Sequence, residues 1–123
     1  TLSINGMYIG KKAPADREHL VMDASFTYMD KEVGYDVDSE NRIDYMEFYT
    51  TTMADDETGL DDINLYYHGE HLDTTEKVIA TLGKNYTPAD GEEYESFEFE
   101  DDELCVEVTL RNGEFTNIKV TPK

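Results

Sequence analysis

Apolar and polar residues alternate along most of the second half of the chain. This period of two residues predicts β-strands with one buried face. It occurs three times in succession, over Tyr94–Glu100, Leu104–Leu110 and Phe115–Thr121. The pair Asn112-Gly113 stands between the last two segments, and this dipeptide favours the two-residue turn of a β-hairpin. We therefore expect an antiparallel meander at the end of the chain.

A helical period replaces this alternation just before the meander. Three apolar residues fall on one helical face: Val78, Ile79 and Leu82. Asp73 followed by Glu76 has the spacing of a capping box, and Gly83 is placed to end the helix in a left-handed conformation. The sequence predicts a helix of about three turns here.

The first half shows the same order of elements in a weaker form. Pro14 suits the start of a helix. The apolar stripe of that helix would consist of Leu20, Val21 and Ala24. Three strands are expected after it, over Phe26–Asp30, Val33–Asp38 and Ile43–Thr52.

An internal repeat connects the two halves. The segment Ile4-Asn5-Gly6-Met7-Tyr8-Ile9-Gly10 returns 59 residues later as Ile63-Asn64-Leu65-Tyr66-Tyr67-His68-Gly69. Near the end of each half, two apolar alternations also flank a polar turn. Short strands resemble one another by chance, but the two matches agree in order. We interpret 1–53 as a first repeat, 54–61 as an acidic linker and 62–123 as a second repeat, together forming one compact domain.

These elements predict an α+β fold of two β-α-β-β-β-like repeats, with helices packed on one face of an antiparallel sheet. The residues expected under the second helix are Val106, Val108, Leu110, Ile118 and Val120. Equivalent positions in the first repeat are Val33, Val37, Met46 and Phe48. The other face of the sheet should stay open.

The second half carries a combination of motifs that points to a family. A segment ending in Gly69 precedes the helix Asp-Thr-Thr-Glu-Lys-Val-Ile-Ala-Thr-Leu-Gly-Lys, and the meander has Asn-Gly in its last hairpin and Ile-Lys-Val in its last strand. This arrangement resembles the repeat unit of the beta-lactamase inhibitor protein, of SmpA/OmlA-type outer-membrane lipoproteins and of small secreted lipoproteins of Gram-positive bacteria. The resemblance covers 63–121, and 4–52 through the repeat. It implies a non-enzymatic, extracytoplasmic bacterial binding or scaffold module.

Charge narrows the range of partners. The chain has 29 Asp and Glu against 10 Lys and Arg, a formal charge of −19. A surface this negative repels phosphate, so direct binding to nucleic acid is not expected. Apolar stretches of only a few residues predict no transmembrane segment. Because the chain begins at Thr1, we expect a removed N-terminal segment, as in a secreted or surface-anchored protein, although trimming explains this start equally well.

One segment fits a calcium-binding loop. Asp36, Asp38, Glu40, Asp44 and Glu47 occupy ligand positions of an EF-hand. However, Asn41 stands where Gly makes the sharp turn, and strand-like residues flank the loop instead of helices. We favour a hairpin here and predict no bound metal or cofactor. A zinc site at His68, Glu70 and His71 is a weaker alternative, since these residues lack a helical metal motif.

No catalytic residue is predicted. Ser, His and Asp occur without a recognisable nucleophile motif. The single cysteine, Cys105, excludes an intramolecular disulfide and has the neighbours of a strand residue. We therefore expect a protein that is not an enzyme.

The open sheet face is the predicted binding site. Strand parity that buries Met46 and Phe48 leaves their neighbours on the opposite face. The residues expected there are Tyr45, Glu47, Tyr49, Tyr94 and Glu98. Tyrosines provide large contact area at low entropic cost, so we predict a protein or a cell-surface glycan as the partner.

A second function stays open. Nine of the 14 residues in Asp90–Glu103 are acidic. Such a run is typical of a solvated strand and turn, but it also fits a mimic of nucleic-acid phosphate that blocks a basic partner protein. The sequence leaves the identity of the partner and the oligomeric state undetermined.

Overall fold

The computed structural model describes residues 1–12, 28–30, 33–49, 60, 63–84, 86–87 and 93–123. Strands hold 55% of the described residues and helices 11%, and the strands form two antiparallel sheets. The predicted α+β class, with helices packed on a sheet face, is therefore wrong. In its described part the protein is mostly β, with one α-helix.

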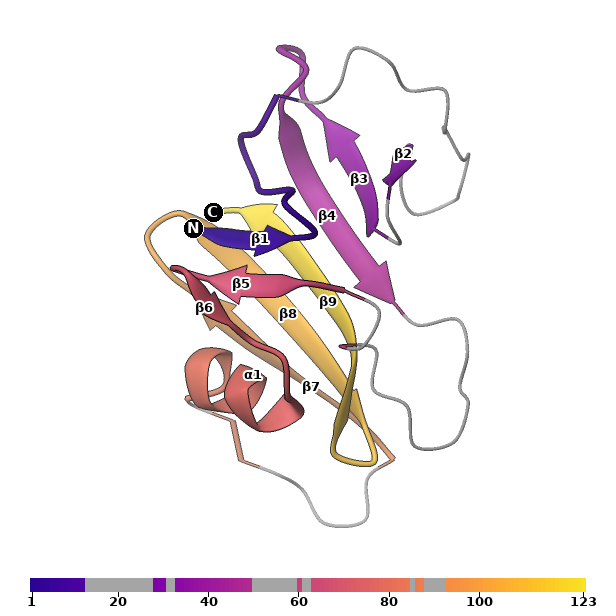
Figure 1. The fold of residues 1–123 in the computed structure, drawn as a ribbon, viewed down its shortest axis with the longest axis vertical. Coiled ribbons are helices and arrows are strands. Elements are labelled where there is room, and N and C mark those ends of the chain that lie inside the picture. Colours follow the sequence, from indigo (N-terminus) through magenta and orange to yellow (C-terminus); the bar gives the residue numbers. More distant parts are fainter. Residues whose placement is uncertain (13–27, 31–32, 50–59, 61–62, 85, 88–92) are drawn as a thin grey trace.

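The larger sheet has six strands and contains the predicted meander. Its strand order is β2-β3-β4-β9-β8-β7, and every neighbouring pair is antiparallel. The strands are β2 (Tyr28–Asp30), β3 (Val33–Val37), β4 (Ile43–Tyr49), β7 (Tyr94–Glu100), β8 (Leu104–Arg111) and β9 (Glu114–Pro122). Each half of the chain supplies three strands, and the halves meet where β4 pairs with β9 (Figure 1).

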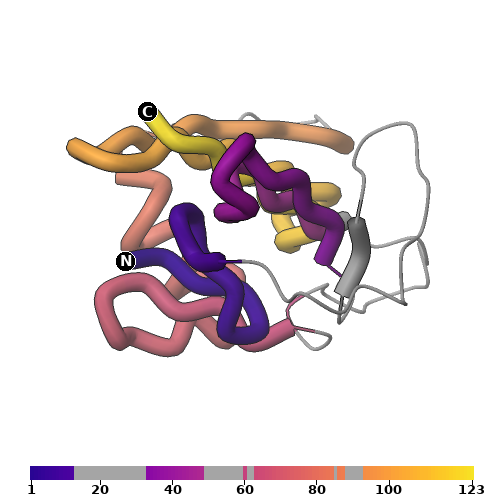
Figure 2. Tube along the Cα trace, turned by 90° about the horizontal axis from the view of Figure 1, so that it is seen from above, coloured from indigo at the N-terminus to yellow at the C-terminus, as the bar shows by residue number. Residues whose placement is uncertain are grey.

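The second layer is a small sheet accompanied by the helix. This sheet has the order β1-β5-β6, formed by β1 (Leu2–Ile4), β5 (Leu65–Tyr67) and β6 (Glu70–His71). It lies with α1 (Thr75–Leu82) on one side of the larger sheet (Figures 1 and 2). Leu2, Ile4 and Leu65 are fully buried, so the strands do most of the covering that we expected from helices. The helix expected near Pro14 lies outside the described residues.

The hydrophobic core confirms the predicted strand parity. The predicted residues of β8 and β9 are buried: Val106, Val108, Leu110, Ile118 and Val120. Val33, Met46 and Phe48 are buried in the first half, while Val37 is partly buried. The odd-numbered residues of β8 and β9 therefore lie on the opposite face of the sheet. The exception is the β-bulge between Thr109 and Leu110, where the register shifts.

Both ends of α1 differ in detail from the prediction. The N-cap is Thr74, whose side chain accepts a hydrogen bond from the Lys77 N–H (3.2 Å). Asp73, the predicted cap, instead pairs with the Lys77 ammonium at 2.8 Å. Gly83 ends the helix at φ −110°, which is not left-handed. It is required for space, because a Cβ there would lie 2.9 Å from the Ile79 carbonyl oxygen.

The tandem repeat stays a prediction. A strand order that mirrors itself about the β4–β9 pair is compatible with it. The predicted repeat aligns Asn5 with Asn64. In the structure, however, Asn5-Gly6 has the same positive-φ turn conformation as His68-Gly69. Asn5 and Asn64 instead contact each other, since the Asn64 N–H donates to the Asn5 side chain at 2.7 Å.

Candidate functional site

The candidate site is a row of charged side chains on the open face of the larger sheet. Strand pairing places Glu47 of β4 beside Lys119 of β9, Lys119 beside Glu107 of β8, and Glu107 beside Glu98 of β7. Lys119, Glu107 and Glu98 are exposed, and Glu47 is half-buried. We call these four residues the acidic row. It combines three carboxylates with one ammonium group, so it carries net negative charge.

Tyr45 lies next to this row. Its hydroxyl donates a hydrogen bond to the Glu47 carboxylate, and the Lys119 ammonium lies 5.9 Å from its ring centroid. Burial raises the pKa of the Tyr45 hydroxyl far above its ordinary value, and the Glu47 hydrogen bond and the nearby negative charges raise it further. The hydroxyl therefore stays protonated and holds Glu47 in place.

The five predicted site residues divide into two groups. Tyr45, Glu47 and Glu98 belong to or adjoin the acidic row. Tyr94 lies at the other end of β7 from Glu100, is 53% exposed, and faces the Arg111 guanidinium, which is 5.9 Å from its ring centroid. Tyr49 ends β4 opposite Asn117, and its side chain lies outside the described residues.

Two residues of the acidic row were missed in the sequence. Glu107 stands between Val106 and Val108, and Lys119 stands between Ile118 and Val120. The alternation that identifies the buried residues already assigns both to the open face. What the alternation does not give is the pairing of β4 with β9, which brings Glu47 beside Lys119.

A pocket of about 570 Å³ adjoins the acidic row. The lining residues from the open face are Glu98, Glu100, Cys105, Glu107, Lys119 and Thr121. The others, Leu82, Lys84, Phe99 and Val106, belong to the covered side of the sheet or to the end of α1. Because β7 is the outermost strand, this lining reaches around the edge of the sheet. Its carboxylates suit a cationic group.

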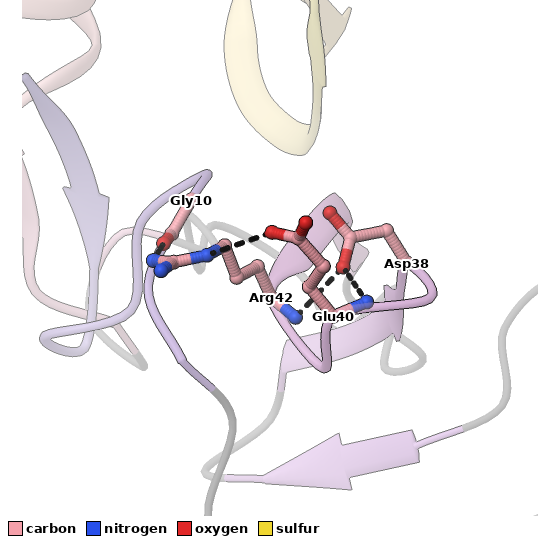
Figure 3. A network of polar contacts seen from close by, with 4 residues as sticks. All are labelled: Gly10, Asp38, Glu40 and Arg42. Carbon is pink, nitrogen blue, oxygen red and sulfur yellow. Dashed lines mark hydrogen bonds and ion pairs between the residues drawn. The ribbon is translucent and has the colours of Figure 1, made fainter.

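The calcium-loop candidate forms a hairpin between β3 and β4. One oxygen of Asp38 accepts hydrogen bonds from the backbone N–H groups of Glu40 (2.8 Å) and Arg42 (3.0 Å) (Figure 3). The Arg42 guanidinium donates to the Gly10 carbonyl at 3.2 Å. Asn41 takes the positive φ of 64° that closes the turn. Strands replace the helices of an EF-hand, so this segment is not an EF-hand.

His68 and His71 do not converge on a common centre. Nδ1 of His68 lies 2.7 Å from the amino nitrogen of Thr1. His71 stacks on Tyr66 with ring centroids 4.6 Å apart. Among the described residues, no group of three or more His, Cys, Asp and Glu side chains is arranged to hold a metal ion.

Comparison of the chain with family models, with characterised proteins and with solved structures gives no match. The resemblance to the lipoprotein repeat unit therefore stays a prediction. In the part of the chain that the structure describes, no helix is long and apolar enough to cross a bilayer.

Proposed function

We propose that this protein is a non-enzymatic binding module whose open sheet face binds a partner protein that carries a basic surface. The acidic row is the observation that supports this proposal. Adjacent strands lie roughly 4.8 Å apart, so Glu98 and Glu107 are neighbouring like charges. A cationic partner relieves their repulsion.

Tyr45 supplies the apolar part of this surface. It is half-buried beside Glu47, and its hydroxyl is already hydrogen-bonded. A ring fixed in this way offers contact area at low entropic cost. The Tyr45 ring and the acidic row together favour a protein partner over a neutral glycan, which has no positive charge to place against the carboxylates.

In line with the lipoprotein resemblance, we propose that this module acts outside the bacterial cytoplasm. The second candidate function uses the same chemistry in another setting. A mimic of nucleic-acid phosphate also presents carboxylates to a basic protein, and the exposed acidic residues of β7 and β8 suit this role. Both functions require a positively charged partner, so one experiment on the acidic row tests their shared basis.

The test is an NMR titration of the ¹⁵N-labelled protein with a decalysine peptide at 150 mM NaCl. We expect the Glu98→Gln/Glu107→Gln double variant to bind at least tenfold more weakly than the wild type. The control is Asp102→Asn/Glu103→Gln, which removes the same charge from exposed residues in the turn between β7 and β8. It should change the affinity less than threefold. Equal losses in both variants would show that only net charge matters, and would refute the proposal.

A further inference from the structure

The outer edge of β7 is an exposed sheet edge. β7 is the last strand of the six-stranded sheet, and no strand in the described part of the chain pairs with its outer side. It is seven residues long, Tyr94–Glu100, which is enough for a stable ladder with an added strand. Edges of this length are templates for another extended chain unless they are blocked.

The backbone groups that face this edge follow from two hydrogen bonds. At one end of the β7–β8 ladder, the Asn112 N–H donates to the Glu93 carbonyl (2.7 Å), and at the other the Asp101 N–H donates to the Leu104 carbonyl (3.1 Å). Bonded pairs alternate in an antiparallel ladder, so the odd-numbered residues of β7 point their backbone groups toward β8. The groups that point outward belong to Tyr94, Ser96, Glu98 and Glu100.

The side chains beside this edge define what can pair with it. Glu98 of the acidic row and Glu100 are both exposed on the open face, and Glu98 lies beside Glu107. On the covered side, Phe99 is partly buried and lines the pocket with Leu82. The side chains of an added strand would therefore alternate between the two faces. Those on the open face would lie beside carboxylates, which suits basic residues. Those on the covered side would lie beside an aromatic ring, which suits apolar residues.

A second copy of this chain is a poor occupant. Pairing β7 with a second β7 would bring carboxylates of the two strands close together, because three of its seven residues are glutamates: Glu95, Glu98 and Glu100. Each chain also carries a formal charge of −19. Charged edge strands protect against this kind of self-association, but they do not exclude a strand of opposite charge.

We infer that β7 accepts an extended segment of the partner protein as a seventh strand, with Lys or Arg alternating with apolar residues. This inference rests on the proposed function, because it assigns the binding mode of the same basic partner. Main-chain hydrogen bonds would supply affinity, and the alternation of side chains would supply specificity.

The test uses the synthetic peptide Lys-Val-Lys-Val-Lys-Val-Lys. We expect saturating peptide to slow amide hydrogen exchange at Ser96, Glu98 and Glu100 at least tenfold, because these N–H groups point outward. The amides of Phe97 and Phe99 already bond to β8 and should change little. Ser96→Pro removes one outward donor without touching the β8 ladder, and proline is tolerated at such edge positions. We expect it to weaken binding at least tenfold, whereas Ser96→Ala should bind within twofold of the wild type.

A charge-matched peptide of the same sequence, with every internal backbone nitrogen methylated, separates strand addition from electrostatic attraction. It has no internal N–H groups to donate to β7, so it should bind at least tenfold more weakly to the wild type, whatever the folding of the Ser96→Pro variant. Equal binding of both peptides, with no protection at Ser96, would overturn strand addition. If that binding were still weakened by Glu98→Gln/Glu107→Gln, the proposed function would survive; if it were not, both proposals would fail.

Discussion

Asp101 joins the small sheet to the larger one through a single carboxylate. One of its oxygens accepts hydrogen bonds from the N–H groups of Glu103 (2.8 Å) and Leu104 (2.7 Å) in the β7–β8 turn. The other accepts the Tyr67 hydroxyl of β5 at 2.9 Å. Desolvation alone would raise the pKa of Asp101, but these hydrogen bonds outweigh it and lower the pKa below 3.8. The ionised carboxylate is therefore the form that stabilises the fold.

Replacing this carboxylate should destabilise the protein in a pH-dependent way. We expect Asp101→Ala to lower the free energy of unfolding by about 2 kcal/mol at pH 7, because it leaves backbone donors and the Tyr67 hydroxyl without their acceptor. Asp101→Asn keeps one acceptor oxygen and replaces the other with an amide NH2 group, so it should cost less than Asp101→Ala. Urea denaturation of the three proteins measures both effects.

The pH dependence of stability shows how much the negative charge of Asp101 contributes, apart from its hydrogen bonds. A carboxyl group whose pKa is lower in the folded state stabilises the fold above its unfolded pKa, and this contribution is lost as the pH falls through the folded value. The advantage of the wild type over Asp101→Asn should therefore be full at pH 7 and should shrink below pH 3.8. An advantage that grows with acidification would contradict this role of Asp101.

At the scale of elements, the end of α1 depends on one close contact. A Cβ on Gly83 would lie 2.9 Å from the Ile79 carbonyl oxygen and 3.3 Å from Cε2 of Phe97 in β7. Gly83→Ala should lower the free energy of unfolding by about 1–2 kcal/mol, because steric strain of this kind exceeds the gain of roughly 0.4–1 kcal/mol from a stiffer unfolded chain. Thermal or urea unfolding measures the change. Lys84→Ala, at the exposed neighbouring position, is the control; a Gly83→Ala protein as stable as the wild type would show that the helix end relaxes freely.

The sequence predicted the long elements well and the short ones poorly. Tyr94–Glu100 forms β7 with the predicted bounds, since seven alternating residues and a following turn leave little ambiguity. The strands β1 and β5 have three residues each, and they pair across the two halves of the chain. No local pattern specifies such a pairing. This missing sheet is the reason that the predicted fold class was wrong.

The candidate site was predictable to a similar extent. Parity along β4 assigned Tyr45 and Glu47 to one face, and parity along β7 did the same for Glu98. Whether these residues adjoin depends on the order β4-β9-β8-β7, which joins strands distant in sequence. That order places Lys119 and Glu107 between Glu47 and Glu98, and so creates the acidic row from two residues that were predicted for the site and two that were not.

At the scale of the whole molecule, one side of the larger sheet packs into the core and the other carries exposed charged side chains. The small sheet and α1 bury the apolar side, and the two halves of the chain contribute to both layers. The open side and the β7 edge carry carboxylates within a chain of net charge −19. Repulsion among these groups opposes folding and at the same time favours a basic partner.

The stability of the isolated protein should therefore rise with salt. Screening shortens the Debye length from roughly 20 Å at 20 mM to about 4 Å at 500 mM, which weakens repulsion among exposed carboxylates. Opposing this, salt also weakens surface ion pairs such as Arg111–Glu93 (3.1 Å) and Lys123–Glu100 (3.0 Å), but such pairs contribute less than about 1 kcal/mol each. Repulsion should dominate at a charge of −19, so we expect NaCl to raise the melting temperature by about 5 °C over this range. The melting temperature of the Glu98→Gln/Glu107→Gln variant should rise less, because part of the repulsion is already removed. A wild-type melting temperature that falls with NaCl would mean that the ion pairs outweigh the repulsion among the carboxylates.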